Sequence, residues 1–345
     1  MSVDNTAFSD VVPLKPEFPL FGGLFRDIGY WIVPKKRPLF SLFDLGSTGV
    51  RFQQTNALSK QKLQIGTFNT LLTVACYGNL TQRETSFRVY VKVSDGINDV
   101  VSLTRTYSIH ESCLIPGSFT IPFSIVKPRL WHGRVDPFLY DATVDIEYNS
   151  AKADSVTTKI GVRSFKVDSQ TGFFLNGAPY PLYGASLHQD FANLGWAIKP
   201  SHVKQNFEAL KELNATALRC SNYQHSDETY SFADELGLIV WADIPNIGVA
   251  PANPAMFVNA GLQLRELIRQ TGSHPSILFW GLAHEPDVFH PDNSFPYPLL
   301  WSLRQIAKLE DPTRLTVGPN LTISRAKILS RPLQYRIRHL LLQLF

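Results

Sequence analysis

The sequence predicts an antiparallel β-sandwich followed by part of an α/β unit with a parallel sheet. Residues 36–163 contain short segments of alternating polarity that are rich in Val, Thr, Tyr and Phe and are separated by Gly, Asn, Asp and Pro. Such spacing is typical of antiparallel sandwiches. After Arg163 strands alternate with amphipathic helices, which favours a parallel sheet, either a barrel or a doubly wound one.

Six segments are the predicted strands of the sandwich. They are residues 62–68, 71–78, 86–94, 102–109, 118–125 and 142–149. The first 35 residues differ from them, because PLFGGLFRDIGYWIV is strand-like around a glycine pair but too short for a domain. We expect this segment to be the last strands of a preceding domain.

The α/β part contains five predicted strands and four predicted helices. The strands are residues 181–189, 215–223, 238–245, 276–285 and 314–320. The helices are 201–214 with Ser201 as its cap, 228–237 ending at Gly237, 259–272 and 298–311. A complete eight-unit barrel takes about 250 residues, and only 181 follow position 164. We therefore expect only a little more than half of a barrel, followed by an atypical basic tail over residues 323–345.

Charge and cysteine content exclude several classes of protein. The net charge is +4, and without the five cations of the acid-free tail it is about −1, so the body is not predicted to bind nucleic acid. Three cysteines form no metal-binding pattern and are interpreted as buried thiols. The polar N-terminus predicts no signal peptide, and no run reaches transmembrane length. The compartment stays open because the chain is expected to be a fragment.

Three ordered passages resemble family 2 glycoside hydrolases, the family of bacterial β-galactosidases and β-glucuronidases. FGGLFRDI is similar to the closing motif of the family's N-terminal jelly-roll sugar-binding domain. VKPRLWHGRVDPFLYDATVDI and IGVRSF are similar to the end of its immunoglobulin-like domain. FLNGAPYPLYGASLHQD, ALRCSNYQHSDETYSFADELGLIVWADIP and SHPSILFWGLAHEP resemble successive strands of its TIM barrel. The resemblance implies a jelly-roll remnant over 1–35, an immunoglobulin-like sandwich over 36–163 and the first part of a TIM barrel over 164–322.

Glu285 is the candidate general acid/base. It follows the apolar strand SILFWGLA, and barrel active sites lie at the carboxyl ends of strands. Burial beside Trp280 is expected to raise the pKa of this carboxyl, as a general acid near neutral pH requires. The resemblance assigns the same position the acid/base role of a retaining glycosidase.

The resemblance also implies the residues around the acid. His188, Asp190 and Tyr223 take positions that face the sugar in the family, Arg219 would support the nucleophile, and Asp243 stands where relatives often have Glu. Two positions depart from the family pattern. Asn222 replaces a His, and His284 replaces the Asn that is understood to bind the sugar 2-hydroxyl. For Trp196 and Trp241, packing is favoured over sugar stacking.

The second carboxylate of the reaction is not found in this sequence. A retaining mechanism needs two carboxyl groups about 5 to 5.5 Å apart. After Glu285 the only glutamate is Glu310, which is predicted to be a surface residue of a helix. We therefore expect a truncated or frame-shifted chain that is inactive by itself and self-associates through its exposed half barrel. No metal and no cofactor are expected.

Alternative functions stay open at this point. The HQD, NYQH and FWGLAHE segments favour a β-galactosidase-like hydrolase acting on β-glycosides, and β-glucuronidase is the rival within the family. A non-catalytic carbohydrate-binding protein is favoured by His284 and Asn222. The basic tail could also form an amphipathic helix at a membrane surface, although Pro332 argues against it.

Overall fold

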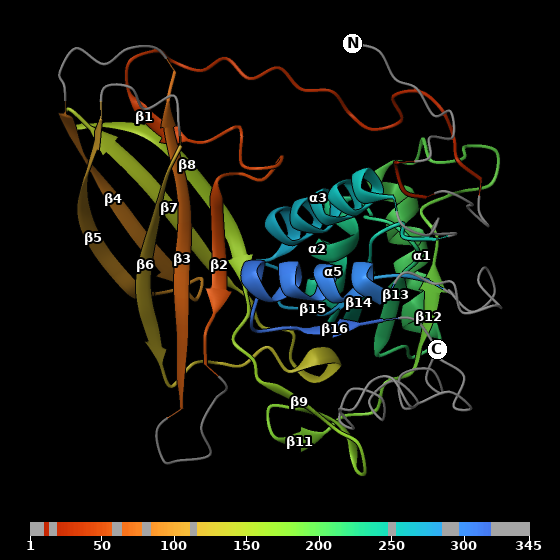
Figure 1. Ribbon diagram of the computed structural model, residues 1–345. Coiled ribbons are helices and arrows are strands. Elements are labelled where there is room, and N and C mark those ends of the chain that lie inside the picture. The colour runs from red at the N-terminus through yellow and green to blue at the C-terminus, as the bar shows by residue number, and fades with distance from the viewer. Residues whose placement is uncertain are drawn as a thin grey trace.

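The computed structural model consists of a β-sandwich and an α/β unit that lie beside each other (Figure 1). It describes residues 10–13, 19–56, 64–77, 84–110, 116–247, 253–284 and 297–318. Glu285, the whole of the predicted tail over 323–345 and the first nine residues therefore lie outside the described residues.

Two antiparallel sheets form the sandwich. In one sheet the central strand is β3 (Ile65–Cys76), which pairs with β1 (Pro38–Phe40), β2 (Val50–Gln54) and β6 (Gly117–Val126). The other has the order β5 (Asp99–His110), β4 (Glu84–Ser94), β7 (Tyr140–Tyr148) and β8 (Ala151–Ile160). Buried side chains alternate with less buried ones along most of these strands, and they meet in one core between the sheets.

Strand β3 corrects the sequence prediction of two strands in this region. Asn69 and Thr70, which were expected to separate them, continue the ladder and pair with β2 on one side and β6 on the other. Strand β8 was not predicted, because AKADSVTTKI has few large apolar residues. Its pairing with β7 along nine residues places it in the sheet.

The cysteine prediction is wrong at one position. Cys76 is disulfide-bonded, whereas Cys220 is a buried free thiol, as expected. Cys113 lies outside the described residues.

Five parallel strands in sequential order form the sheet of the α/β unit. They are β12 (Gly184–Leu187), β13 (Ala217–Cys220), β14 (Ile239–Asp243), β15 (Ile277–Gly281) and β16 (Leu315–Val317). The order never reverses, which fits part of a barrel and not a doubly wound sheet. Within the described residues the sheet is open, with β12 and β16 at its two edges.

Within the described ranges, four helices pack against this sheet. They are α1 (Pro200–Glu212), α2 (Asp227–Leu236), α3 (Pro254–Thr271) and α5 (Tyr297–Glu310). Helix α2 ends at Gly237 as predicted, with a φ of 73° that favours glycine. Helix α1 begins one residue before the predicted cap, because Pro200 is well suited to a first helical position. None of the helices in the described ranges is long and apolar enough to cross a bilayer.

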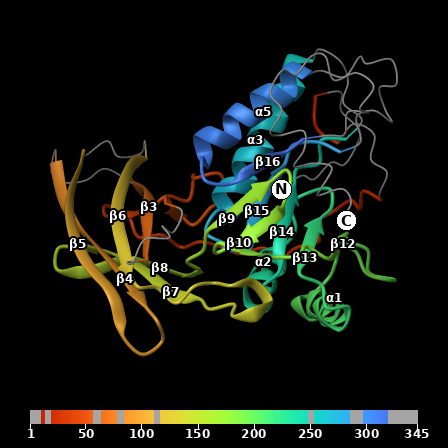
Figure 2. The ribbon, with the colours of Figure 1, turned by 90° about the horizontal axis from the view of Figure 1, so that it is seen from below.

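A small three-stranded sheet closes one end of the α/β unit. It consists of β9 (Phe165–Asp168), β10 (Gly172–Leu175) and β11 (Ala178–Pro179). It lies below the parallel sheet in Figure 1, and in Figure 2, which is seen from below, β9 and β10 lie in front of that sheet. Phe173 and Leu175 pack into one core with Ala217 and Ile239, the first residues of β13 and β14. Because the amino ends of the strands are filled in this way, polar groups are left to the opposite, carboxyl ends.

One buried arginine joins the two units. Arg163 donates from Nη1 to Oε1 of Gln54 in β2, at 3.3 Å. On the α/β side, its Nε donates to the carbonyl of Pro275 at 2.6 Å, and its Nη2 to that of Ile277 at 3.4 Å. Desolvation lowers the pKa of this guanidinium to about 9.

A charged histidine lies near the same joint. Burial would lower the pKa of His274, but Asp234, 2.6 Å from Nδ1, and Asp227, 3.2 Å from Nε2, outweigh it and raise that pKa to about 9. The folded state therefore binds this proton more tightly than the unfolded chain, whose histidine titrates near 6.5. The stabilisation is complete below pH 6.5 and is lost as pH rises through about 9.

We predict that the free energy of unfolding, measured by urea titration, decreases between pH 6.5 and 9.5. The variant His274→Gln should be less stable at pH 6.5 and should lose most of this decrease, because glutamine does not titrate. An equal slope in both proteins would contradict the assignment of the proton to His274.

Candidate active site

Arg219 is the centre of a polar cluster at the carboxyl ends of β13, β14 and β15. Its Nε and Nη2 donate to Oδ2 of Asp243 at 3.0 and 2.7 Å. Nη2 also lies 3.0 Å from Oδ1 of Asn222 and 2.9 Å from Nδ1 of His284. The guanidinium carbon is 4.6 Å from the centre of the Trp241 ring. Groups from three strands thus meet on one guanidinium.

Strand alternation explains why these side chains share a face. Arg219 in β13 lies between Leu218 and Cys220, both of which belong to the core under the helices. In β14, Ala242 belongs to that same core, whereas Trp241 and Asp243 face Arg219. Successive side chains in a strand point to opposite sides, so the polar group is directed to the side away from the helices.

The Arg219–Asp243 ion pair is largely withdrawn from water. The Asp243 side chain is 3% exposed and that of Arg219 14%. Burial raises the pKa of the Asp243 carboxyl to about 6, and the attraction of Arg219 limits the rise. A buried pair of this kind costs desolvation, and it is tolerated because Arg219 also binds its neighbours through directed hydrogen bonds.

Gly281 makes room for this ion pair. It ends β15 beside Asp243, its partner in the sheet. A Cβ built on Gly281 would overlap the Oδ1 atom of Asp243 and the indole nitrogen of Trp241. Glycine is therefore required here by the close approach of the carboxylate.

The other predicted sugar-facing residues lie around this cluster. His188 follows β12 and is in ring contact with Tyr223, at 5.9 Å between centroids. Burial lowers the pKa of His188 and raises that of Tyr223 to about 12. The Tyr223 hydroxyl accepts a hydrogen bond from the backbone of Gln189 at 3.0 Å, which joins the loops after β12 and β13. Asp190 is exposed.

Two residues lie where the sequence analysis did not place them. Trp280 belongs to the core under the helices, and its Nε1 donates to Asp311 at 3.1 Å, so it is not among the polar side chains around Arg219. Glu310 lies in a helix as predicted but is not a free surface residue. It forms a two-point ion pair with Arg269 at 2.9 and 3.0 Å. Glu285 itself follows the last described residue of this stretch, His284.

The packing role predicted for Trp241 is confirmed, whereas Trp196 is partly exposed and lines a pocket. Trp241 is 6% exposed and belongs to the core at the base of the sheet. Trp196 makes edge contacts with Phe21 and Phe25, at 5.8 and 5.2 Å between ring centres, and lies 4.8 Å from Tyr223.

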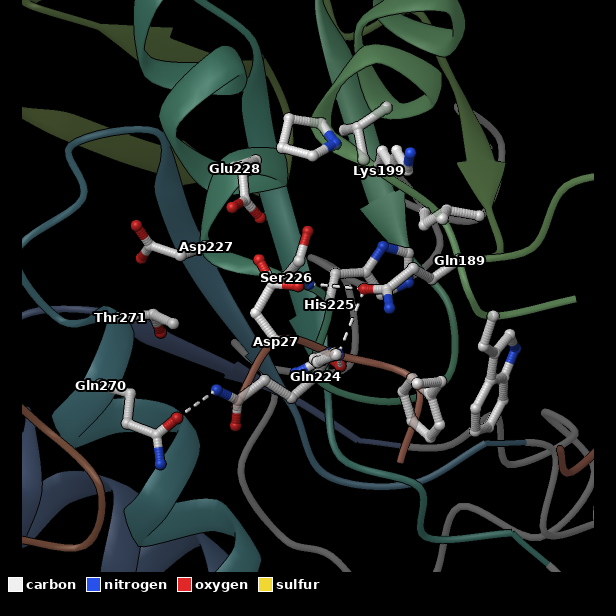
Figure 3. Close-up of a pocket in the computed structure, with 16 residues that line it drawn as sticks. Asp27, Gln189, Lys199, Gln224, His225, Ser226, Asp227, Glu228, Gln270 and Thr271 are labelled. Carbon is white, nitrogen blue, oxygen red and sulfur yellow. Dashed lines mark hydrogen bonds between the residues drawn. The ribbon is translucent and has the colours of Figure 1, made fainter. Parts of the chain in front are cut away.

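A pocket of about 360 Å³ lies between the FGGLFRDI segment, the starts of α1 and α2 and the end of α3 (Figure 3), and none of the polar side chains around Arg219 lines it. Arg26 donates to Oε1 of Gln189 at 3.2 Å and to the carbonyl of Gln224 at 3.1 Å. These two residues belong to the loops that carry His188 and Asn222. Sequence reasoning missed Arg26, because no local pattern shows that a residue so far upstream reaches the barrel loops.

No group of three or more His, Cys, Asp or Glu side chains within the described ranges is arranged to hold a metal ion.

Comparisons with known proteins identify the family. The model of the TIM barrel domain of glycosyl hydrolases family 2 matches residues 165–325, and a second model of glycosyl hydrolases family 2 matches residues 69–163. This chain belongs to glycoside hydrolase family 2. Members of the family are glycosidases, and the sandwich and the parallel sheet correspond to its immunoglobulin-like and TIM-barrel domains. The jelly-roll assignment of the first residues stays a prediction.

The chain resembles two kinds of glycosidase, named β-glucuronidases and β-galactosidases. A β-glucuronidase of Bacteroides fragilis is 34% identical over 318 residues, which are 90% of this chain and 43% of that protein. A β-galactosidase of Thermoanaerobacterium thermosulfurigenes is 27% identical and shares 92% of this chain and 41% of its own length. Among solved structures, a putative β-galactosidase of Bacteroides fragilis has a TM-score of 0.80 at 31% identity, covering 93% of this chain and 46% of that one. The chain spans less than half the length of these relatives.

We predict that Gly281→Ala destabilises the chain by about 1–3 kcal/mol, because the added methyl group overpacks the Asp243 carboxylate. Gly318→Ala is the matched control, since a Cβ at Gly318, which directly follows β16, meets no atom of the described residues within 4 Å. Urea unfolding followed by circular dichroism measures both. Equal stability of the two variants would show that the carboxylate does not need this space.

Proposed function

We propose that this chain carries the acid/base half of a retaining glycosidase site for β-glucuronides, with Glu285 as the acid/base. The observation that carries the proposal is the Arg219 cluster at the carboxyl ends of β13–β15, since His284 in this cluster directly precedes Glu285. Barrel enzymes place their catalytic groups at these strand ends. His188, Asp190, Asn222, Tyr223 and His284 are the proposed sugar-binding residues, with Arg219 and Asp243 in support.

The relatives favour glucuronides over the galactosides that the sequence motifs suggested. The relative at 34% identity is a β-glucuronidase. A solved β-glucuronidase of Bacteroides uniformis, 27% identical with a TM-score of 0.80 over 92% of this chain and 38% of that one, is covalently bound to cyclophellitol-6-carboxylate aziridine. A covalent bond to a sugar mimic needs a nucleophile in that protein, which supports a retaining mechanism here. β-Galactosides are the second candidate, supported by the β-galactosidase relatives.

We further propose that the 345-residue polypeptide does not turn over substrate by itself. The only glutamate after Glu285 is Glu310, which is held in an ion pair with Arg269. The three later aspartates include Asp311, which pairs with Arg314 at 2.6 Å and with Trp280. Glu310 and Asp311 are thus engaged away from the Arg219 cluster, and neither is placed to attack an anomeric carbon there. The other two aspartates, Asp287 and Asp292, lie outside the described residues.

The test combines binding and turnover. We expect methyl β-D-glucuronide to bind the purified chain more tightly than methyl β-D-galactoside in calorimetry, and the 4-nitrophenyl glycosides of both sugars to remain uncleaved. The control is Glu285→Gln, which keeps the shape of the side chain and removes its acid.

Three outcomes would change the proposal. Cleavage that Glu285→Gln abolishes would show that the chain completes its own site. Tighter binding of the galactoside would reverse the substrate assignment. Failure to bind either sugar would contradict the sugar-binding residues proposed here.

A further inference from the structure

The loop after β14 contains a buried polar residue that the sequence analysis did not single out. Asn246 is 0% exposed, and Ile244 and Ile247 near it are buried as well. The backbone N–H of Asn246 donates to the Ile244 carbonyl at 2.8 Å, and that of Ile247 donates to the Pro245 carbonyl at 3.1 Å. Two such bonds in succession form a tight turn. The backbone donors of this loop are therefore used within the loop and not by β15.

Asn246 nevertheless binds the chain that continues β15. The last registered pair of β14 and β15 is Asp243 with Gly281. Beyond it, Nδ2 of Asn246 donates to the carbonyl of Leu282 at 2.8 Å. The backbone N–H of His284 donates to the carbonyl of Asn246 at 3.1 Å. One residue thus holds a carbonyl and an N–H that are two positions apart.

This arrangement has the pattern of a parallel β-bridge centred on Ala283. In a parallel ladder, a residue donates its N–H to the carbonyl before its partner and accepts from the N–H after it. In Asn246 the side-chain amide takes the place of the backbone N–H, which is bonded to Ile244. An ionised aspartate would lack this donor, and glutamine is one methylene group longer. Asparagine is therefore the residue type that extends the sheet here.

The bridge ends at the residue that precedes the proposed acid/base. We propose that Asn246 is a positioning residue of the site, because its bonds to Leu282 and His284 fix the backbone to which Glu285 is attached. Since Asn246 is 0% exposed, it acts through these neighbours and not by touching a sugar. The role of Glu285 in this statement rests on the proposed function, whereas the bridge does not.

A strand end that carries a catalytic group needs support on both sides. Displacing such a group by about 1 Å can reduce the rate about a hundredfold. Toward β16, the Leu282 N–H donates to the Val317 carbonyl at 2.9 Å. Toward β14, the two bonds of Asn246 complete the support. The strand end is thereby held from both neighbouring strands.

Hydrogen exchange of the backbone amides tests the bridge in the complete chain labelled with 15N-histidine. The nine histidines give up to nine backbone amide signals, and His284→Asn identifies the one that belongs to His284. This amide should be protected in the original chain, and an unprotected amide overturns the proposal. In Asn246→Ala its exchange should be about tenfold faster, the effect of one lost hydrogen bond on a local opening.

The amide of His225 is the internal reference. It is buried in the same unit and donates to the Tyr230 hydroxyl at 3.1 Å. A positioning role predicts faster exchange at His284 with the rate at His225 unchanged. Equal acceleration of both amides would show a general loss of stability and overturns the proposal. Should Asn246→Ala fail to fold, Asn246→Ser should give the same selective acceleration, because its hydroxyl is too short to reach the Leu282 carbonyl.

Sugar binding tests the consequence for the site, with Asn56→Ala as the matched control. The Asn56 amide in the sandwich donates to the Ile65 carbonyl and accepts from the Thr67 N–H, both at 2.9 Å. We expect Asn246→Ala to weaken binding of methyl β-D-glucuronide about tenfold in calorimetry. Asn56→Ala should bind within about twofold of the original chain, because distant sites act independently. Equal losses in the two variants, or no loss in Asn246→Ala, overturn the positioning role.

The two measurements separate this proposal from the proposed function. If methyl β-D-glucuronide does not bind the original chain, the proposed substrate is wrong. The exchange rate of His284 relative to His225 then still decides whether Asn246 holds the strand end.

Discussion

A buried arginine between the sandwich and the α/β unit sets the position of the parallel sheet relative to the sandwich. Arg163 follows the last long strand of the sandwich and is buried, with the carbonyls of Pro275 and Ile277 on one side and Gln54 on the other. A buried charge is tolerated only when its donors are used. Strand β15 begins at this contact, so the sandwich sets the position of the strand that ends just before His284.

A second guanidinium, that of Arg219, lies at the carboxyl ends of the parallel strands. The amino ends of the sheet are filled by aromatic and aliphatic side chains, which stabilise the unit. At the carboxyl ends Arg219 gathers a carboxylate, an amide and an imidazole. Barrel enzymes have the same division, with packed amino ends and polar carboxyl ends of the strands. The loops at the carboxyl ends can vary without disturbing the core. Gly281 shows how close the two regions come, because a single methyl group there would disturb the ion pair.

Sequence patterns predicted the elements of the α/β unit well. Its strands and helices repeat apolar residues at regular spacing, and Gly237 and Pro200 fix helix ends through local backbone preferences. The sandwich was predicted less accurately. Strand β3 is so long that a turn was expected within it. Strand β8 is stabilised mainly by its pairing with β7, and a short sequence window does not show this pairing. Trp280 was assigned to the site because it is close in sequence to Glu285, although alternation along β15 directs it to the helices.

The sequence by itself determined the family, the order of the units and the residue types at the ends of the strands. These follow from local periodicity and from motifs that are continuous in the chain. Only the tertiary structure decided that Asn222, Asp243 and His284 share one guanidinium, that Arg26 holds the loops beside them, and that Glu310 is bound elsewhere. Such contacts join residues far apart in the chain through directional hydrogen bonds. Their geometry depends on how whole strands pack, and a local pattern of residues does not specify that packing.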